Sequence, residues 1–594
     1  MANNEIMQRI VDLEREIATL PSGSVSKKTI KDKIYYYHRM TRDGKVKETY
    51  VDFKDVDTLK AQIKKRRELE KELKKLRRIE PASAKKSSKT EFNTYIRVGE
   101  DLKKFASYVK KYKKRECYSK LHKYIYGERQ DRVFVLYGLR RTGKITLIRQ
   151  IIADMTEEEL KKSAFIQIKS SDEIAKLNKD LKQLEKQGYK YVFIDEVTLL
   201  EDFIEGAALF SDIYAACGMK IVLSGTDSLG FLFTEKNELY DRCITLHTTF
   251  IPYREFENVL GIKGIDEYIR FGGTMSLSGV KNNEESPFAD IKKTDEYIDT
   301  AIARNIQHSL RYYQDGGHFR HLYSLYEKGE LTSAINRVVE DINHHFTVEV
   351  LTKTFKSSDL SISARNLLKD RNNSIDILSN IDRESVENRM MQTLEILDIE
   401  EKTIDIDEIC ALEIKEYLGL LDLTMDINEE YLPVGNPTKK IAITQPGMRY
   451  SQATELVNSL LQDEKFNTFS ITERAYVLER LLSEVKGRML EEIILLETKV
   501  ANPNKKVFKL QFSSGEFDMV VADNDTLSCE IFEIKYSQEV VQNQYRHLID
   551  DEKCSATEFR YGKITNKYVI YRGETTEVNG IKYVNAEEYL KSLA

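Results

Sequence analysis

The spacing of apolar residues divides the chain into segments with different expected structures. In residues 5–20 and 55–80 the apolar positions recur at helical spacing, which predicts two helices like the arms of a hairpin. Between them, residues 31–53 alternate around an Asp-Gly turn, the pattern of a β-hairpin. Residues 91–130 are expected to be helical, and residues 131–260 alternate short apolar strands with helices, as α/β domains do.

The rest of the chain is expected to be helical first and mixed afterwards. A mainly helical section follows to about residue 350, and residues 385–450 suggest a small helix-plus-hairpin module such as a winged helix. The C-terminal section then carries a helix, two strands, a second helix and a final strand. These elements are expected at residues 487–497, 517–523, 529–536, 537–550 and 567–571.

Composition narrows the class of protein. A length of 594 residues predicts several domains, and 41% apolar with 32% charged residues is typical of a soluble globular protein. No apolar run is long enough to span a membrane, and the first residues lack the pattern of a secretion signal. The six cysteines are scattered, without metal-ligand spacing or a dense disulfide framework. A cytoplasmic protein without a membrane partner is therefore expected.

Charge is distributed unevenly along the chain. Residues 1–130 hold 35 Lys and Arg against 19 Asp and Glu, a net charge of +16. Because the whole chain has a net charge of −5, the remaining residues have a net charge of −21. Such an excess suggests a basic arm for nucleic acid or another polyanion, and the tyrosines of the expected hairpin could stack on bases. A solvated charged helix and a simply packed small sheet are the alternative interpretations.

A phosphate-binding motif follows the strand at residues 133–137. Gly138-x-x-x-x-Gly143-Lys144 leads into a helical segment, so backbone amides can turn inward around an anion while the lysine reaches the outer phosphates. The next position, where a Ser or Thr hydroxyl normally ligates Mg²⁺, is Ile145, so binding is better supported than hydrolysis. The candidate nucleotide-binding residues are Gly138, Arg141, Thr142, Gly143, Lys144, Thr146 and Asp195, with ATP and Mg²⁺ as the expected cofactors.

Two later strands fit the same site. Residues 190–194 end in Asp195-Glu196, where the aspartate can hold Mg²⁺ and the glutamate can polarise an attacking water. The strand at residues 220–224 is followed by hydroxyls in a position to sense a γ-phosphate. These hydroxyls belong to Ser224, Thr226 and Ser228. Candidate charge-sensing arginines are Arg242, Arg254 and Arg304, although an arginine in a chain with 92 basic residues is usually a surface charge.

A second chemical group lies near the C-terminus. Glu533 and Lys535 share one strand face because they are two residues apart, and Asp518 on the neighbouring strand could meet Glu533 around a divalent ion. Oxygen ligands for Mg²⁺ or Mn²⁺ beside a lysine suit metal-assisted phosphodiester cleavage, and Glu491 on the preceding helix offers a further acid. The alternative is an ordinary edge-strand ion pair.

The motifs together resemble a known family. The run Gly-Leu-Arg-Arg-Thr-Gly-Lys, then Phe-Ile-Asp-Glu-Val, Leu-Ser-Gly-Thr-Asp-Ser and residues 239–242, 250–256 and 271–273 resemble archaeal-type AAA/STAND-like P-loop ATPases, and the C-terminal region resembles PD-(D/E)XK nucleases. The resemblance spans roughly residues 95–594. It implies phosphate binding by Gly138, Gly143 and Lys144, metal and water roles for Asp195 and Glu196, and a nuclease centre of Asp518, Glu533, Lys535 and Glu491. The Gln-x-x-x-Tyr helix of some relatives is absent, since the sequence reads Gln542-Asn-Gln-Tyr545.

The expected architecture is therefore multidomain α/β. A P-loop NTPase core carries a helical lid and a winged-helix-like module, a restriction-endonuclease-like α/β domain lies at the C-terminus, and a helical hairpin with a β-hairpin lies at the N-terminus. The expected boundaries are 1–80 for the basic arm, 81–94 for a linker, 95–260 for the ATPase core, 261–380 for a helical subdomain, 381–464 for the winged-helix-like module and 465–594 for the nuclease-like domain.

The expected function is that of a nucleotide-controlled, metal-dependent DNA endonuclease. The resemblance implies a setting in antiphage defence or a mobile element, and an oligomer is plausible because such ATPase modules often place one subunit's arginine at another's phosphate. The alternative is a non-cleaving, ATP-dependent signalling or DNA-binding switch. A motor would need robust hydrolysis, against which Ile145 argues.

Overall fold

In the computed structural model the chain forms two compact units, Met1–Glu91 and Phe92–Ala594. The helix expected at residues 5–20, the first part of the winged-helix-like module and Ser228 lie outside the described residues. Those described are 24–30, 33–42, 45–51, 53–79, 92–128, 131–200, 202–226, 230–231, 234–235, 238–275, 286–312, 319–356, 408–433, 435–459 and 471–593.

The first unit is a small sheet with one long helix. Strands β1 (Ser24–Ile30), β2 (Lys33–Arg42) and β3 (Lys45–Val51) pair antiparallel in that order, and α2 (Phe53–Ile79) packs against β1 and β2. The hairpin expected from alternation is β2–β3. Strand β1 was not expected, because its sequence Ser-Val-Ser-Lys-Lys-Thr-Ile has little apolar alternation.

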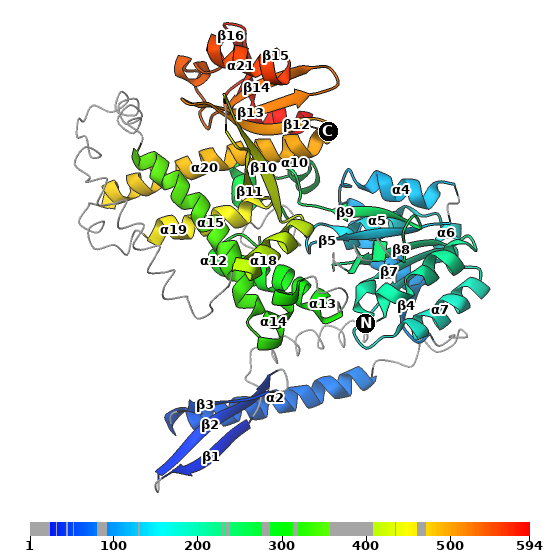
Figure 1. The fold of residues 1–594 in the computed structure, drawn as a ribbon. Helices are drawn as coiled ribbons and strands as arrows, with labels where there is room; N and C mark the ends of the chain where they lie inside the picture. Colours follow the sequence, from blue (N-terminus) through cyan, green and yellow to red (C-terminus); the bar gives the residue numbers. More distant parts are fainter. Residues whose placement is uncertain are drawn as a thin grey trace. The chain divides into compact units, whose positions relative to one another are not determined.

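The second unit begins with a six-stranded sheet in the order β4-β6-β7-β8-β5-β9 (Figure 1). Alternate residues of β5 belong to two apolar clusters, with Val133 and Val135 on one face of the sheet and Phe134 and Leu136 on the other. Both faces of the sheet are therefore buried, and helices cover each of them. All pairs are parallel except β4–β6. The strands are β4 (Tyr95–Val98), β5 (Val133–Gly138), β6 (Ser163–Gln167), β7 (Tyr191–Asp195), β8 (Lys220–Gly225) and β9 (Cys243–Thr248).

Short helices connect these strands and cover the sheet. Strand β4 lies within the segment expected to be helical, because its four residues pair with β6 at the edge of the sheet. The α-helices are α3 (Gly99–Ser107), α4 (Tyr118–Tyr126), α5 (Lys144–Asp154), α6 (Glu157–Lys161), α7 (Ile174–Lys186) and α8 (Phe203–Gly206). Helices of 3₁₀ type span Tyr108–Lys111 and Val197–Leu199, and a π-helix spans Phe210–Ala215.

A helical section follows, as the sequence predicts. Its apolar core joins helices on both sides of the undescribed residues 357–407, since Ile335 of one and Ile414 of the other belong to the same cluster. The helices are α10 (Tyr253–Leu260), α11 (Ile265–Phe271), α12 (Ile291–Tyr297), α13 (Arg304–Tyr312), α14 (Arg320–Lys328), α15 (Leu331–Lys356), α18 (Glu408–Leu420) and α19 (Pro446–Ser459), with a π-helix at Ile298–Ala303.

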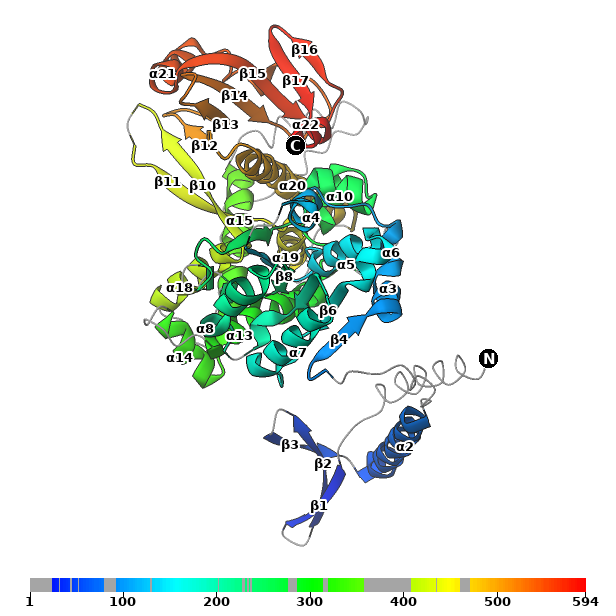
Figure 2. The same cartoon turned by 90° about the vertical axis from the view of Figure 1, so that its right-hand side faces the viewer.

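The C-terminal sheet has eight strands in the order β11-β10-β12-β13-β14-β15-β17-β16 (Figure 2). The long helix α20 (Ile471–Ala501) leads into it and packs on β12, and β14 and β15 pair parallel through a crossover containing α21 (Asp551–Tyr561). The remaining elements are β10 (Thr424–Tyr431), β11 (Thr438–Ile443), β12 (Lys506–Gln511), β13 (Glu516–Asp523), β14 (Ser528–Ile534), β15 (Lys563–Tyr571), β16 (Thr576–Val578), β17 (Ile581–Asn585) and α22 (Ala586–Ser592).

Two further features, both in the C-terminal part, differ from the sequence-based expectation. The β10–β11 hairpin extends the C-terminal sheet, because the edge of β10 pairs with β12, instead of forming a separate winged-helix module with α18. The helix expected at residues 537–550 is only a 3₁₀ helix at Gln542–Tyr545. The α-helix begins later because Asp550 accepts a hydrogen bond from the Lys553 amide and caps it.

Among the described residues, none of the helices is long and apolar enough to cross a membrane.

Candidate functional site

The glycine-rich loop joins the end of β5 to the start of α5. Gly138 has φ 138°, and a side chain there would overlap the carbonyl oxygen of Thr248 on β9. Gly143 has φ 90° and is the residue before the first turn of α5, so only glycine turns the chain here without strain. The loop therefore presents backbone amides and the positive end of a helix dipole, as an anion-binding site requires.

The loop's side chains are held by its own backbone. The Lys144 ammonium donates to the carbonyl oxygens of Gly138 (2.8 Å) and Leu139 (2.7 Å). Burial lowers the pKa of Lys144 to about 8, while the Glu196 and Asp195 carboxylates act in the opposite direction. Loop carbonyls therefore hold this cation in place at the turn.

The other candidate residues of the loop have different surroundings. Thr142 is buried, and its hydroxyl donates to the Leu139 carbonyl at 2.8 Å, so it braces the loop from inside. Arg141 is exposed, with φ 63°. Ile145 is partly buried against the apolar cluster under α5, where it contributes packing in place of a metal-binding hydroxyl. Thr146 is half-buried beside it.

The two acids expected to serve this site lie at the carboxyl end of β7. The Ser224 hydroxyl, on β8 between β5 and β7, donates to Asp195, and the Thr226 hydroxyl donates to Glu196 at 3.3 Å. Burial raises the pKa of Asp195 and of Glu196, and the Asp195 charge adds to the rise at Glu196. The structure thus brings these acids to the end of the sheet from which the Lys144 loop starts.

Two residues that brace the loop were missed from the sequence. Arg115 is 8% exposed, donates to the Thr142 carbonyl at 2.7 Å and to Glu255 at 2.6 Å, and so ties the loop to α10. The Met275 amide donates to the Arg141 carbonyl at 2.8 Å. Both lie far from the motif in sequence and carry no motif of their own. Arg254, one of the candidate charge-sensing arginines, donates two hydrogen bonds to Glu116, at 2.8 and 2.9 Å. Its guanidinium is therefore already paired with a carboxylate.

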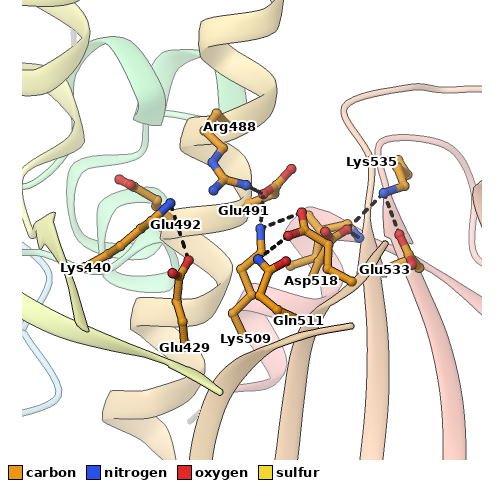
Figure 3. A network of polar contacts seen from close by, with 12 residues as sticks. Glu429, Lys440, Arg488, Glu491, Glu492, Lys509, Gln511, Asp518, Glu533 and Lys535 are labelled. Atoms are coloured by element: carbon orange, nitrogen blue, oxygen red, sulfur yellow. Dashed lines mark hydrogen bonds and ion pairs between the residues drawn. The ribbon is translucent and has the colours of Figure 1, made fainter. Parts of the chain in front are cut away.

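The C-terminal residues Asp518, Glu533 and Lys535 converge at neighbouring ends of β13 and β14 (Figure 3). The Lys535 ammonium lies 2.9 Å from an Asp518 oxygen and 2.6 Å from a Glu533 oxygen. Asp518 also accepts a hydrogen bond from the Ile534 amide at 2.8 Å. Both carboxyl side chains are 2% exposed, so water solvates their charges poorly.

Environment separates the proton affinities of the two carboxyls. Burial opposes ionisation of Asp518, but Lys535 and then Lys509 outweigh it and hold the pKa of Asp518 well below its usual range. Burial and the adjacent Asp518 charge raise the pKa of Glu533 well above its usual range. Burial disfavours the Lys535 charge, yet the two carboxylates raise its pKa.

Glu491 reaches the same centre from α20. It forms an ion pair with Arg488, and one of its oxygens lies 3.6 Å from the Lys509 ammonium on β12 (Figure 3). Lys509 is 3% exposed by side chain and lies 2.7 Å from Glu516. Sequence reasoning missed Lys509, Glu516 and Arg488. Glu516 could have been found, because it is two residues from Asp518 and shares its strand face.

The residues present suit a hard divalent cation. One oxygen of the buried Glu533 carboxyl has no hydrogen-bond partner, and the Asp518 carboxylate adjoins it. Among the described residues, no group of three or more His, Cys, Asp or Glu side chains is arranged to hold a metal. Mg²⁺ commonly binds through one or two carboxylates together with waters and substrate phosphates, which is the donor set that this pair would complete.

Two segments of the chain match family models. Residues 130–257 match a family model described as an AAA domain, and residues 3–61 match one described as a domain of unknown function (DUF6788). No curated protein matches the chain. A solved structure of the Aeropyrum pernix ORC1 protein in complex with DNA is 12% identical and aligns over 61% of this chain and 97% of that chain, with a TM-score of 0.22, too low to support an argument. The family match shows that the chain contains an AAA-type P-loop ATPase domain, which implies nucleotide binding and usually Mg²⁺.

Proposed function

We propose that the protein is an ATP-binding, nucleotide-controlled and metal-dependent DNA endonuclease. The observation that carries the proposal is the convergence of Asp518, Glu533 and Lys535, with the lysine within 2.9 Å of both buried carboxyls. The order of helix, three strands, crossover helix and parallel strand around this centre supports a PD-(D/E)XK-like domain.

The proposed chemistry assigns a role to each of these residues. Asp518 and Glu533 would hold Mg²⁺ or Mn²⁺, which supplies electrostatic stabilisation to charge developing on a phosphodiester. Lys535 would donate to a phosphate oxygen or orient the attacking water with its ammonium group. Glu491, held by Arg488, would orient a further water from the helix side.

The nucleotide half of the proposal rests on the loop before α5. Gly138, Gly143 and Lys144 would bind the phosphates, with Arg141, Thr142 and Thr146 alongside and with Asp195 and Glu196 serving Mg²⁺ and water. Because Ile145 replaces the metal-ligating hydroxyl, this site would bind ATP and hydrolyse it slowly. Control by nucleotide would suit an antiphage or mobile-element setting, in which uncontrolled cutting harms the host.

The nucleic-acid half of the proposal rests on charge. The net +16 of residues 1–130 would hold DNA electrostatically, and binding should weaken steeply with salt. The protein would assemble as a homo-oligomer, in which an arginine of one subunit lies near the phosphate bound by another.

The test is a cleavage assay on supercoiled, linear and single-stranded DNA and on RNA, with Mg²⁺ or Mn²⁺. Asp518→Asn and Glu533→Gln should each reduce metal-dependent cutting by roughly 10³-fold. The matched control is Glu530→Gln, on the same strand as Glu533. Glu530 accepts hydrogen bonds from Asn566 and Tyr568 outside the centre, and glutamine keeps the accepting oxygen.

A non-cleaving nucleotide switch is the second candidate. The ion pairs of Lys535 with both carboxyls favour it, because the lysine already balances the negative charge that a metal ion would otherwise balance. Intact ATP binding without cutting of any substrate, in the wild type and in every variant, would establish this alternative and reject the nuclease.

A further inference from the structure

The beginning of helix α11 contacts Tyr536, the residue that follows Lys535 of the C-terminal centre. The Asp266 carboxylate accepts a hydrogen bond from the Tyr536 hydroxyl and pairs with Arg572, and the Lys486 ammonium of α20 lies 3.4 Å away. The Arg572 guanidinium lies over the Tyr536 ring at 4.3 Å. Tyr536 directly follows Lys535, so Asp266, in the helical section, fixes the side chain next to the candidate nuclease lysine.

The segment after the same helix touches the nucleotide loop. The Met275 amide bonds to the Arg141 carbonyl, and a side-chain carbon built on Gly143 would lie 2.7 Å from the Met275 sulfur. Gly143 is the residue at which the loop enters α5, where phosphate binds in such sites. Met275 therefore packs against the part of the loop that must accommodate a phosphate.

Glycines keep the connection between these two contacts short. The Ile251 amide bonds to the Gly273 carbonyl at 3.1 Å, and the Gly447 amide bonds to the Gly272 carbonyl at 3.2 Å. A side-chain carbon on Gly273, which has φ 102°, would lie 2.6 Å from the Gln445 backbone. Residues 272–275 are thus held on two sides, and only a short segment separates Met275 from the end of α11 at Phe271.

We propose that Asp266 is a positioning residue through which nucleotide at the glycine-rich loop sets the arrangement of Tyr536 and Lys535. The inference deepens the proposed function and rests on it. Phosphate binding moves the loop against Met275, residues 272–275 carry the movement to α11, and the Asp266 contact carries it to the end of β14. Coupling of this kind is reciprocal, so occupation of the C-terminal centre also changes nucleotide affinity.

The connection through α10 is a different one. Arg115 and Glu255 tie α10 to the loop, and the Tyr253 amide donates to Glu497 of α20 at 2.8 Å. That route ends six residues along the helix from Glu491, whereas the Asp266 route ends beside Lys535. Asp266 can therefore be altered while the α10 contacts stay in place.

The experiment is hydrogen exchange of the full chain with and without a non-hydrolysable ATP analogue. The reporters are the Lys535 amide, bonded to the Ile570 carbonyl at 2.8 Å, and the Arg572 amide, bonded to the Ser537 carbonyl at 2.8 Å. In the wild type the analogue should change their exchange rates at least about threefold. Asp266→Asn and the milder Tyr536→Phe should abolish this response while nucleotide affinity, measured with a fluorescent ATP analogue, is retained.

The matched control is Glu267→Gln, the next residue on α11, whose carboxylate lies 3.8 Å from Arg270 on the same helix. It should keep the wild-type response. Bound nucleotide without a change at either amide, or an unchanged response in both Asp266→Asn and Tyr536→Phe, overturns the inference alone. Failure of the wild type to bind nucleotide overturns the inference together with the nucleotide half of the proposed function. A lost response in these variants supports the inference even if no DNA is cut.

Discussion

The two charged sites of the second unit are built in opposite ways. The nucleotide loop is one stretch of chain between Gly138 and Lys144, and its shape comes from backbone atoms and two glycines at positive φ. The C-terminal centre takes its side chains from α20, β12, β13 and β14. A contiguous site follows from local sequence, whereas a distributed site depends on strand register and on the neighbours that the fold supplies.

The lysines of the two sites also have different surroundings, and their pKa values are shifted in opposite directions. Lys144 is buried among carbonyl oxygens, and burial lowers its pKa to about 8. Lys535 lies between two buried carboxyls, which raise its pKa. Removing Lys144 therefore takes one weakly compensated cation from a loop, whereas removing Lys535 leaves two acids facing each other.

Lys535→Met should give the largest effect. The substitution removes the main compensating charge of Asp518 and Glu533, so the free energy of unfolding at neutral pH should fall by roughly 3 kcal/mol and cleavage should be lost. A divalent cation can replace the missing charge, so Mg²⁺ should raise the melting temperature of the variant more than that of the wild type. Thermal unfolding with and without Mg²⁺ measures this effect independently of cutting.

Lys506→Met is the control, because this surface lysine on β12 pairs with Glu430 outside the centre. Its melting temperature should respond to Mg²⁺ as that of the wild type does. Equal Mg²⁺ responses in the wild type and both variants would mean that the two carboxyls hold no metal.

Glu497 tests the junction between the two sites through pH. Burial raises its pKa from 4.5 to about 7, so between these values the folded state binds more protons than the unfolded state. This carboxyl should therefore lower the free energy of unfolding as pH rises through that window, by up to about 3 kcal/mol. Denaturant unfolding of wild type and Glu497→Gln across the window should show a difference that changes with pH. Parallel pH curves would exclude the buried acid as the cause.

Ile145→Thr should give the smallest effect and bears on the nucleotide site alone. The hydroxyl would supply the missing metal ligand, and Mg²⁺-dependent ATP hydrolysis should rise by roughly tenfold. Ile145→Val, which keeps the apolar contact under α5, should leave hydrolysis unchanged. Equal rates for the two variants would show that the isoleucine is not what limits turnover.

The sequence predicted the parts of each site that local chemistry encodes. The loop, the strand ending in Asp195-Glu196 and the Glu-x-Lys strand were found because glycine spacing and alternation are local signals. Arg115 and Met275 were missed because they reach the loop from distant segments. The β10–β11 hairpin looked like a separate module because alternation identifies a strand but not its partner across a sheet edge.

Control of cutting by nucleotide can be measured as the DNA cleavage rate of wild type and Lys144→Ala with and without ATP in the presence of Mg²⁺. ATP should change the wild-type rate by about tenfold or more and should leave the Lys144→Ala rate unchanged. Equal wild-type rates with and without ATP, at concentrations where ATP is bound, would contradict control by nucleotide.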